Sequence, residues 1–299
     1  MSDYRLENNE FIIENYDSKA PFTSFLPGLT GEDGIPLWSF YVNRGQCLTS
    51  FGIEKKENPI MEFQPAVIAY ENTSLKGFRT FIRKNDEYFE PFSVNYDAKV
   101  KRTMRIKANS FRIIETDYTH NFKTEITYFI LPHEPFGALV RNVTFTNLGE
   151  EADFEILDGM SRIIPYGIPG TKFTTMANLM RSYNTVSNLK NDVPLFFSRI
   201  ESDDAAEMKE NVGGYYYMCF DNNGTICPIY DPCALFENET SLQFPINFIM
   251  HGLKFVAGYS QHFTNKISCA FAPVAKKLST NQNYTLSTLC GFAHNEDFI

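Results

Sequence analysis

The chain has 299 residues, of which 43% are hydrophobic and 15% aromatic, enough to bury a large core in one or two domains. Its net charge of −9, without a basic stripe, argues against a nucleic-acid partner, because phosphate contacts need clustered positive charge. No stretch resembles a signal peptide or a membrane span, so we expect a cytoplasmic protein with no membrane partner and with its six cysteines as reduced thiols.

The first part of the chain predicts strands. A strand over 11–16 enters segment 22–46, which concentrates Gly and Pro and leads into the run that carries Trp38, the sole tryptophan. Residues 38–53 predict two strands joined by a turn at 43–46. Alternation predicts further strands over 60–63, 77–83, 88–89, 100–106 and 111–116, and residues 64–76 are expected to form a loop.

The clearest pattern spans 122–158. Strands over 122–131, 138–147 and 152–158, separated by turns, predict a three-stranded meander. One helix is predicted over 170–183, from the helical spacing of its apolar residues, and it is expected to pack on a sheet edge. Strands follow over 193–200, 213–220, 266–271 and 284–292, whereas 221–263 is expected to be irregular.

This pattern predicts an all-β fold. Short strands at fairly regular spacing favour a large antiparallel β-super-sandwich with few short helices, formed by residues 1–299 as one domain. The alternative is two packed lobes that divide near residue 190.

One charged pair follows from the alternation. Arg141 shares a face with the apolar residues of strand 138–147, and Asp158 shares a face with those of strand 152–158. If loop 148–151 joins these as neighbouring strands, Arg141 lies opposite Asp158, and a buried guanidinium needs such a partner. We predict a structural salt bridge that fixes strand register; the alternative is a ligand-binding role.

No catalytic residue is identified. The sequence contains no GxSxG, GxxxxGK[ST], HExxH or GxGxxG motif. Its five histidines are dispersed and its cysteines lack zinc-site spacing, so we expect no metal site.

Loops fixed by Gly or Pro carry the candidate contact residues. Aromatic rings with amide and guanidinium donors suit sugars, whose apolar faces are edged by hydroxyls. The alternative is that these groups only fix loops. The candidates for substrate binding or a domain interface are Trp38, Asn43, Arg44, Gln46, Arg79, Arg162 and Tyr166.

Several segments together resemble the N-terminal region of bacterial cellobiose-phosphorylase-like enzymes, the inverting β-glucan phosphorylases. The resemblance covers nearly the whole chain, although no segment is by itself a catalytic signature. The segments are FIIENYDSKAPFTSFLPGLTGEDGIPLWSFYVNRGQCLTSFGIEKKENPIMEFQPA from Phe11, AYENTSLKGFRTFIR from Ala69, FGALVRNVTFTNL from Phe136, FEILDGMSRIIPYGI from Phe154 and STLCGFAH from Ser287.

The resemblance implies a galactose-mutarotase-like sandwich that packs on a catalytic (α/α)6 barrel and shapes its sugar-binding cleft, in some members with homodimerisation. The barrel would supply the general acid, and inorganic phosphate would be the co-substrate, with no other cofactor. This chain shows no barrel pattern, so we expect it to be inactive in phosphorolysis alone. We expect segment 22–46 to be exposed, with Arg44 and Gln46 facing the barrel.

Two other functions remain open. A stand-alone carbohydrate-binding sandwich would show a compact aromatic groove, whereas a phosphorylase module would show a broad apolar face. A mutarotase-like enzyme would need a histidine and a carboxylate in a cleft, which the scattered histidines disfavour.

Overall fold

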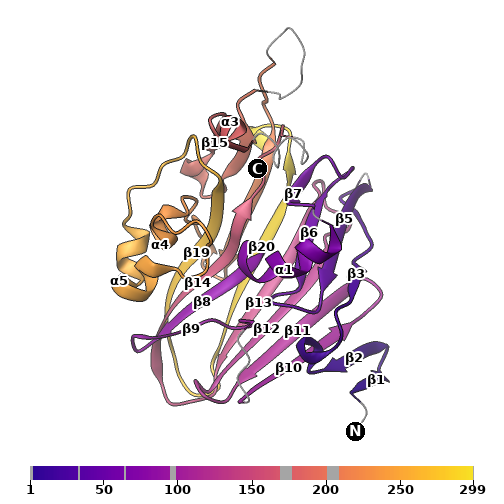
Figure 1. The fold of residues 1–299 in the computed structure, drawn as a ribbon, viewed down its shortest axis with the longest axis vertical. Coiled ribbons are helices and arrows are strands. Elements are labelled where there is room, and N and C mark those ends of the chain that lie inside the picture. Colours follow the sequence, from indigo (N-terminus) through magenta and orange to yellow (C-terminus); the bar gives the residue numbers. More distant parts are fainter. Residues whose placement is uncertain are drawn as a thin grey trace.

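Antiparallel sheets in two layers build the fold (Figure 1). The computed structural model describes residues 3–32, 34–63, 65–94, 99–168, 177–200 and 209–298. Within them, one large sheet forms one layer and two smaller sheets form the other. The prediction of an all-β sandwich is confirmed.

The large sheet contains eleven strands of the described chain. Their order is β1 (Tyr4–Glu7), β2 (Glu10–Glu14), β10 (Val100–Ile106), β11 (Ser110–Asp117), β12 (Phe122–Ile130), β13 (Ala138–Asn147), β20 (Asn283–Ala293), β17 (Gly214–Asp221), β16 (Leu195–Ser198) and β15 (Asn184–Ser187), with β18 (Gly224–Thr225) paired to β17. Neighbouring strands of this sheet pair antiparallel, as the alternating sequence patterns predict.

The second layer holds the two smaller sheets. One has the order β19 (Ser268–Leu278), β14 (Ala152–Ile163), β8 (Phe78–Lys84) and β9 (Glu87–Phe89). The other has β3 (Thr23–Phe25), β5 (Ile35–Val42), β6 (Leu48–Ile53) and β7 (Pro59–Met61), with β4 (Leu29–Thr30) paired to β5. The β5–β6 pair confirms the hairpin predicted over 38–53.

The main core lies between the layers. Ile126, Val143 and Phe145 of the large sheet belong to one buried cluster with Phe154 and Ile156 of β14. These side chains occupy alternate positions along their strands, so each strand turns one apolar face inward. A second cluster lies on the opposite face of the β14 sheet, under the helices.

The expected three-stranded meander is wrong at its third strand. β12 pairs with β13, but β13 then pairs with β20, while β14 pairs with β8 and β19 in the other layer. The buried Asn147 fixes this corner: its amide donates to the carbonyls of Glu150 (2.7 Å) and Leu278 (2.9 Å). The chain therefore crosses between layers after β13 instead of returning beside it.

Segment 22–46 lies mostly in strands; much of 22–36 is exposed, whereas 37–46 is buried or half-buried, so the expectation of an exposed segment holds only for its first half. It forms β3, β4 and β5. The Thr30 hydroxyl, fully buried, accepts from the Ala138 amide at 2.7 Å and donates to the Leu131 carbonyl at 2.9 Å. A Cβ at Gly28 would lie 2.4 Å from Ile130, so glycine allows this close approach.

The helices differ most from the expectation. They are α1 (Ala66–Lys76), α3 (Ala177–Arg181), α4 (Cys233–Phe236) and α5 (Ile246–Ala257), with single 3-10 turns at Tyr16–Ser18, Leu189–Asn191 and Glu296–Phe298. Of the helix predicted over 170–183, residues 170–176 lie outside the described residues, and α3 forms the centre of the remainder. The expectations of a loop over 64–76 and of an irregular 221–263 are wrong, because α1, α4 and α5 lie there.

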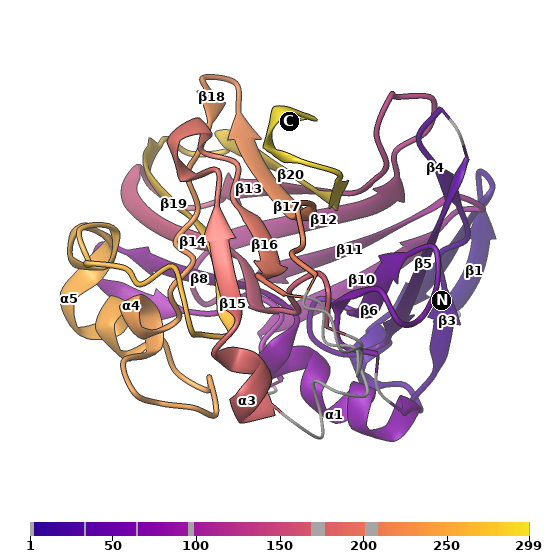
Figure 2. The same cartoon turned by 90° about the horizontal axis from the view of Figure 1, so that it is seen from above.

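Figure 2 shows α4 and α5 on the side of the β8–β14–β19 sheet that faces away from the large sheet. Phe81, Leu157 and Phe271 of that sheet form a buried cluster with Phe236 and Phe248 of the helices. Within the described ranges, no helix is long and apolar enough to cross a membrane.

Candidate functional site

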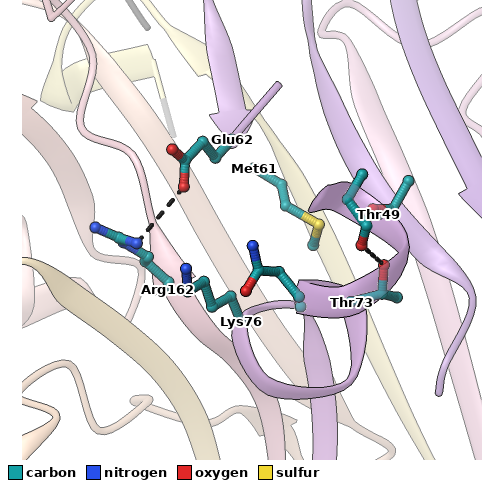
Figure 3. A pocket seen from close by; sticks show the side chains of 9 residues that line it. Thr49, Met61, Glu62, Thr73, Lys76 and Arg162 are labelled. Carbon is teal, nitrogen blue, oxygen red and sulfur yellow. Dashed lines mark hydrogen bonds and ion pairs between the residues drawn. The ribbon is translucent and has the colours of Figure 1, made fainter. Parts of the chain in front are cut away.

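Arg162, at the end of β14, is the sequence-predicted residue that lies at a cavity. The register of β14 against β19 shifts between Met160 and Ile163, and such a bulge re-aims the side chains beside it. Arg162 therefore leaves the regular alternation of β14, and its guanidinium points toward Glu62, which directly follows β7 (Figure 3). It borders two hollows, one small and one large.

The small hollow, drawn in Figure 3, is enclosed by β6, β7, α1 and the end of β14. Glu62, Lys76 and Arg162 line it beside Met61 and Thr73. Its volume of about 20 Å³ is enough for about one water molecule and too small for a sugar. It is therefore part of the support of Arg162 and not a ligand site.

Positive charges gather around this point. The Arg162 guanidinium lies 3.5 Å from the Glu62 carboxylate. Burial lowers the pKa of Arg162; the charge of Glu62 opposes this shift, and the charge of Arg181 adds to it. Burial and then the nearby Arg162 also lower the pKa of Lys76. Arg162 is thus influenced by the exposed Arg181 and itself influences Lys76.

The large hollow, called the Arg162 groove below, lies between the end of β14, α3, α4 and the start of β19. Its volume is about 430 Å³, within the range of about 300–1,000 Å³ that small-molecule sites occupy. Arg162, Arg181 and Lys266 supply its cationic side chains, and Phe236 and Leu242 supply part of its apolar lining.

Two lining residues of the groove differ in their contacts. The Lys266 ammonium donates to both carboxylate oxygens of Asp231 at 2.9 Å and lies 3.3 Å from the Cys233 sulfur. Ser161 is 2% exposed, and its hydroxyl has no hydrogen-bond partner among the described residues. Buried polar groups normally have a hydrogen-bond partner, so the Ser161 hydroxyl is an unsatisfied hydrogen-bonding group at the wall of the groove.

Arg79 shapes a wall of the groove without lining it. Its guanidinium donates to both carboxylate oxygens of Glu90, at 2.7 and 2.9 Å. It also donates to the carbonyls of Leu242 and Gln243, the latter at 3.0 Å. Arg79 is 3% exposed, so its role here is to fix the loop that carries Leu242.

The predicted ion pair of Arg141 and Asp158 is confirmed. Arg141 Nη1 lies 2.5 Å from Asp158 Oδ2, and both side chains are at most 1% exposed. Burial lowers the pKa of Arg141, but the charge of Asp158, its hydrogen bond and the nearby Tyr128 and Tyr217 together outweigh burial, so this pKa is raised. The pair joins the two layers of the sandwich. The expectation that Arg141 and Asp158 lie on neighbouring strands of one sheet is therefore wrong.

Gln46 completes the network around this pair. Its amide donates to the Thr80 hydroxyl at 2.8 Å and its carbonyl accepts from Arg141 at 2.7 Å, while Thr80 donates to Asp158 at 2.6 Å. Gln46 is 3% exposed, so the expectation that it faces a domain junction is wrong. A buried charge requires every partner to be satisfied, and Gln46 supplies one of them.

Asn43 is another interior residue. Its amide donates to the carbonyls of Tyr16, Lys19 and Ala20, and its carbonyl accepts from the Phe22 amide at 3.0 Å. With no exposed surface, it fixes the chain that enters β3 and contacts no groove.

The other predicted residues lie apart from the groove. Arg44 is half-buried, with its guanidinium 5.3 Å from the Tyr70 ring of α1. Tyr166 packs its ring against Phe292 at 4.6 Å. Trp38, also half-buried, donates from its indole nitrogen to the Lys55 carbonyl at 2.9 Å.

The sequence prediction missed the residues that surround Arg162. They are Ser161, Glu62, Lys76, Arg181 and Lys266. A signal for α1 was present, because Pro65 precedes it and Gly77 follows it, the usual start and stop residues of a helix. Within the described ranges, no group of three or more metal-ligating side chains comes together.

Neither a protein-family model nor a curated protein sequence matches the chain. Solved structures to which it is similar include a polysaccharide lyase, with 12% identity over 88% of this chain and 33% of the other and a TM-score of 0.44. A protein assigned as a kojibiose phosphorylase, from the human microbiome, gives 9% identity over 99% and 34%, with a TM-score of 0.43. A bacterial glucoamylase complexed with acarbose gives 9% over 93% and 36%, with a TM-score of 0.41.

The chain spans about a third of the length of these three structures. All three carry names of carbohydrate-active enzymes. Identities of 9–12% with TM-scores below 0.5 do not transfer an activity from one protein to another.

Proposed function

We propose that this chain is the β-sandwich module of an inverting β-glucan phosphorylase, and that it packs on a helical catalytic barrel and borders its sugar-binding cleft. The barrel would contribute the general acid, and inorganic phosphate would be the co-substrate. The enzyme would act in the cytoplasm, with a homodimer as its possible assembly.

The observation that carries this proposal is the convergence of three resembling segments at Arg162. Glu62 belongs to the end of the segment that begins at Phe11, Lys76 to AYENTSLKGFRTFIR and Arg162 to FEILDGMSRIIPYGI, and these side chains meet around one hollow (Figure 3). Segments far apart in sequence thus bring their polar residues to one edge of the sandwich. This edge is the part of the surface that we assign to the cleft.

An exposed aromatic surface on the five-stranded sheet supports the docking of a further domain. Trp38 contacts Phe40 and Phe63, with ring centroids 6.2 and 5.6 Å away, and Phe25 lies opposite Phe40 in register. Phe25 is 62% and Phe63 47% exposed. Contiguous exposed apolar surface commonly marks an interaction site. We refer to Phe25, Trp38, Phe40 and Phe63 as the aromatic face.

A stand-alone carbohydrate-binding protein is the second candidate, favoured by the Arg162 groove. The groove is large enough for a sugar and combines Phe236 with amide and cationic side chains. Under this alternative the isolated chain would bind a glucan oligosaccharide without a partner domain.

Phosphorolysis assays test the proposal. The purified chain alone is expected to release no glucose 1-phosphate from cello- or laminari-oligosaccharides in phosphate buffer, whereas the chain together with the helical barrel of the same enzyme is expected to release it. Phe63→Asp should weaken the association of chain and barrel. Tyr118→Asp, at a ring 58% exposed outside the aromatic face, is the matched control.

The proposal is overturned if the chain alone catalyses the release. It is also overturned if no helical partner restores activity while the isolated chain binds the oligosaccharides, which is the outcome expected of a stand-alone carbohydrate-binding protein.

A further inference from the structure

We propose that the Arg162 groove contains an oxidation site, where hydrogen peroxide joins the Cys233 sulfur to the side-chain nitrogen of Lys266 by a sulfenamide bond. Thiols would break this bond again, so the modification is reversible. The inference goes beyond the proposed function, because it requires neither a barrel nor a sugar.

The two reacting atoms are already in contact. The Lys266 ammonium lies 3.3 Å from the Cys233 sulfur, although 33 positions separate the two residues in the chain. Both residues line the Arg162 groove, Cys233 at the start of α4 and Lys266 just before β19. A lysine side chain ends on a flexible stem, so a short movement brings nitrogen and sulfur to bonding distance.

Asp231 holds the lysine in this position. Both of its carboxylate oxygens accept from the Lys266 nitrogen at 2.9 Å, and Asp231 has no exposed surface. The same carboxylate accepts from the backbone amides of Cys233 at 3.0 Å and His262 at 2.9 Å. One buried group therefore fixes both the ammonium and the backbone of the cysteine, so the contact of nitrogen with sulfur follows from the fold.

Cys233 differs from the other five cysteines in its surroundings. Cys227 is also half-buried, but burial and then the charge of Asp192 raise its pKa to about 11, which disfavours the thiolate that reacts with peroxide. Cys233 instead has the ammonium of Lys266 beside its sulfur. The remaining cysteines are buried, and they are Cys47, Cys219, Cys269 and Cys290.

The groove gives peroxide a route to the sulfur. Its volume of about 430 Å³ far exceeds the roughly 30 Å³ that a water molecule occupies in the liquid. Ser161 lines the same groove, is 2% exposed, and has no hydrogen-bond partner for its hydroxyl among the residues that the structure describes. A small polar molecule in the groove can accept this hydrogen bond, and peroxide is such a molecule.

The reaction consists of two balanced steps. In the first, the Cys233 sulfur attacks one peroxide oxygen; the S–O bond forms, the O–O bond breaks, and the second oxygen leaves as water with the thiol proton, which yields a sulfenic acid. In the second, the Lys266 nitrogen attacks the sulfur; the N–S bond forms, and the S–O bond breaks with loss of water. Sulfur is oxidised by two electrons and peroxide is reduced to water.

Asp231 accounts for the remaining proton. Burial lowers the pKa of Lys266, but its hydrogen bonds to Asp231 and Cys233 and their charges together outweigh burial, so this pKa is raised. The nitrogen therefore starts as an ammonium and must lose a proton before it attacks. Asp231 contacts it with both oxygens and can accept that proton. The ion pair then becomes a neutral pair, and no buried charge is left without a partner.

Peptide mass spectrometry of the purified chain, digested without reductant after treatment with hydrogen peroxide, is the test. We expect one linked pair of peptides, which contain Cys233 and Lys266 and are together lighter by two hydrogen atoms than the separate peptides. Dithiothreitol is expected to release both peptides unchanged, because a thiol attacks the sulfur and returns the amine.

Variants assign the link to these two residues. Lys266→Arg keeps a positive charge beside Asp231 but offers no nucleophilic amine, so Cys233 should be oxidised to a sulfenic acid without a link. Lys254→Arg, at an exposed lysine of α5, and Cys227→Ser, at the other half-buried cysteine, are the matched controls, and both should form the link as the parent chain does.

The inference is overturned if peroxide leaves Cys233 unmodified or oxidises it without a link in the parent chain. It is also overturned if Lys266→Arg still gives a linked peptide, or if Cys227→Ser abolishes the link. These measurements follow mass and require no turnover, so failure of the phosphorolysis assay leaves them unaffected, and their failure leaves the proposed function intact.

Discussion

Removing the charge of Asp158 tests how much the sandwich depends on its buried ion pair. Asp158→Asn keeps the shape of the side chain but leaves the Arg141 guanidinium, 1% exposed, without a counter-charge. Breaking one half of such a pair costs about 3–5 kcal/mol, since a buried charge remains uncompensated. This is a large share of the roughly 5–15 kcal/mol that stabilises a typical domain.

The double variant separates charge from packing. In Arg141→Met with Asp158→Asn no buried charge is left, and the main loss is the hydrogen bond from Arg141 to Gln46, about 1–3 kcal/mol. We therefore expect the two substitutions to be far from additive, with a coupling energy of at least about 2 kcal/mol.

Guanidinium chloride unfolding, followed by the fluorescence of the sole tryptophan and by circular dichroism, measures these free energies. Glu151→Gln, which breaks the exposed pair with Lys277, is the control and is expected to leave the unfolding midpoint unchanged. The reasoning is refuted if Asp158→Asn costs less than about 1 kcal/mol or if the costs of the two single variants add in the double variant.

Three further predictions use local contacts. Gly52→Ala should cost about 1–3 kcal/mol and shift the tryptophan emission, because a Cβ there would lie 2.3 Å from Trp38 Cζ2; an unchanged spectrum would contradict this. Thr30→Val leaves the buried Ala138 amide without its acceptor, so chemical unfolding should show a loss of about 1–3 kcal/mol, and a cost near zero would refute the role given to Thr30. A thiol reagent at pH 8 should modify the half-buried Cys233 before the buried cysteines, as peptide mapping would show; prior labelling of a buried cysteine would be the contrary result.

Strand positions could be read from the sequence because alternation is a local property. The hairpin over 38–53 and strands β12, β13 and β20 appear where the pattern placed them. α5 was missed because Gly252, with a φ of 75°, interrupts its helical geometry, and α1 because its apolar residues form only a weak stripe.

Sheet membership could not be read in the same way. The turn between β13 and β14 looks the same in sequence whether the second strand returns beside the first or crosses to the other layer. The crossing to the other layer is fixed by the hydrogen bond from the Asn147 amide to the carbonyl of Leu278, a residue far along the chain. The prediction of surface contact residues was wrong for Asn43 and Gln46 for a related reason. A polar residue near Gly or Pro can also hold a loop or complete a buried hydrogen-bond network, and both residues do so here.

By itself, the sequence determined the all-β class and the need of Arg141 for a carboxylate partner, because both follow from which residues share a face of a strand. Tertiary structure alone decided that Asp158 reaches Arg141 across the core, and that Glu62, Lys76 and Arg181 gather around Arg162. Those four residues come from different segments of the chain, and only the packing of β7, α1, β14 and α3 brings the other three close to Arg162.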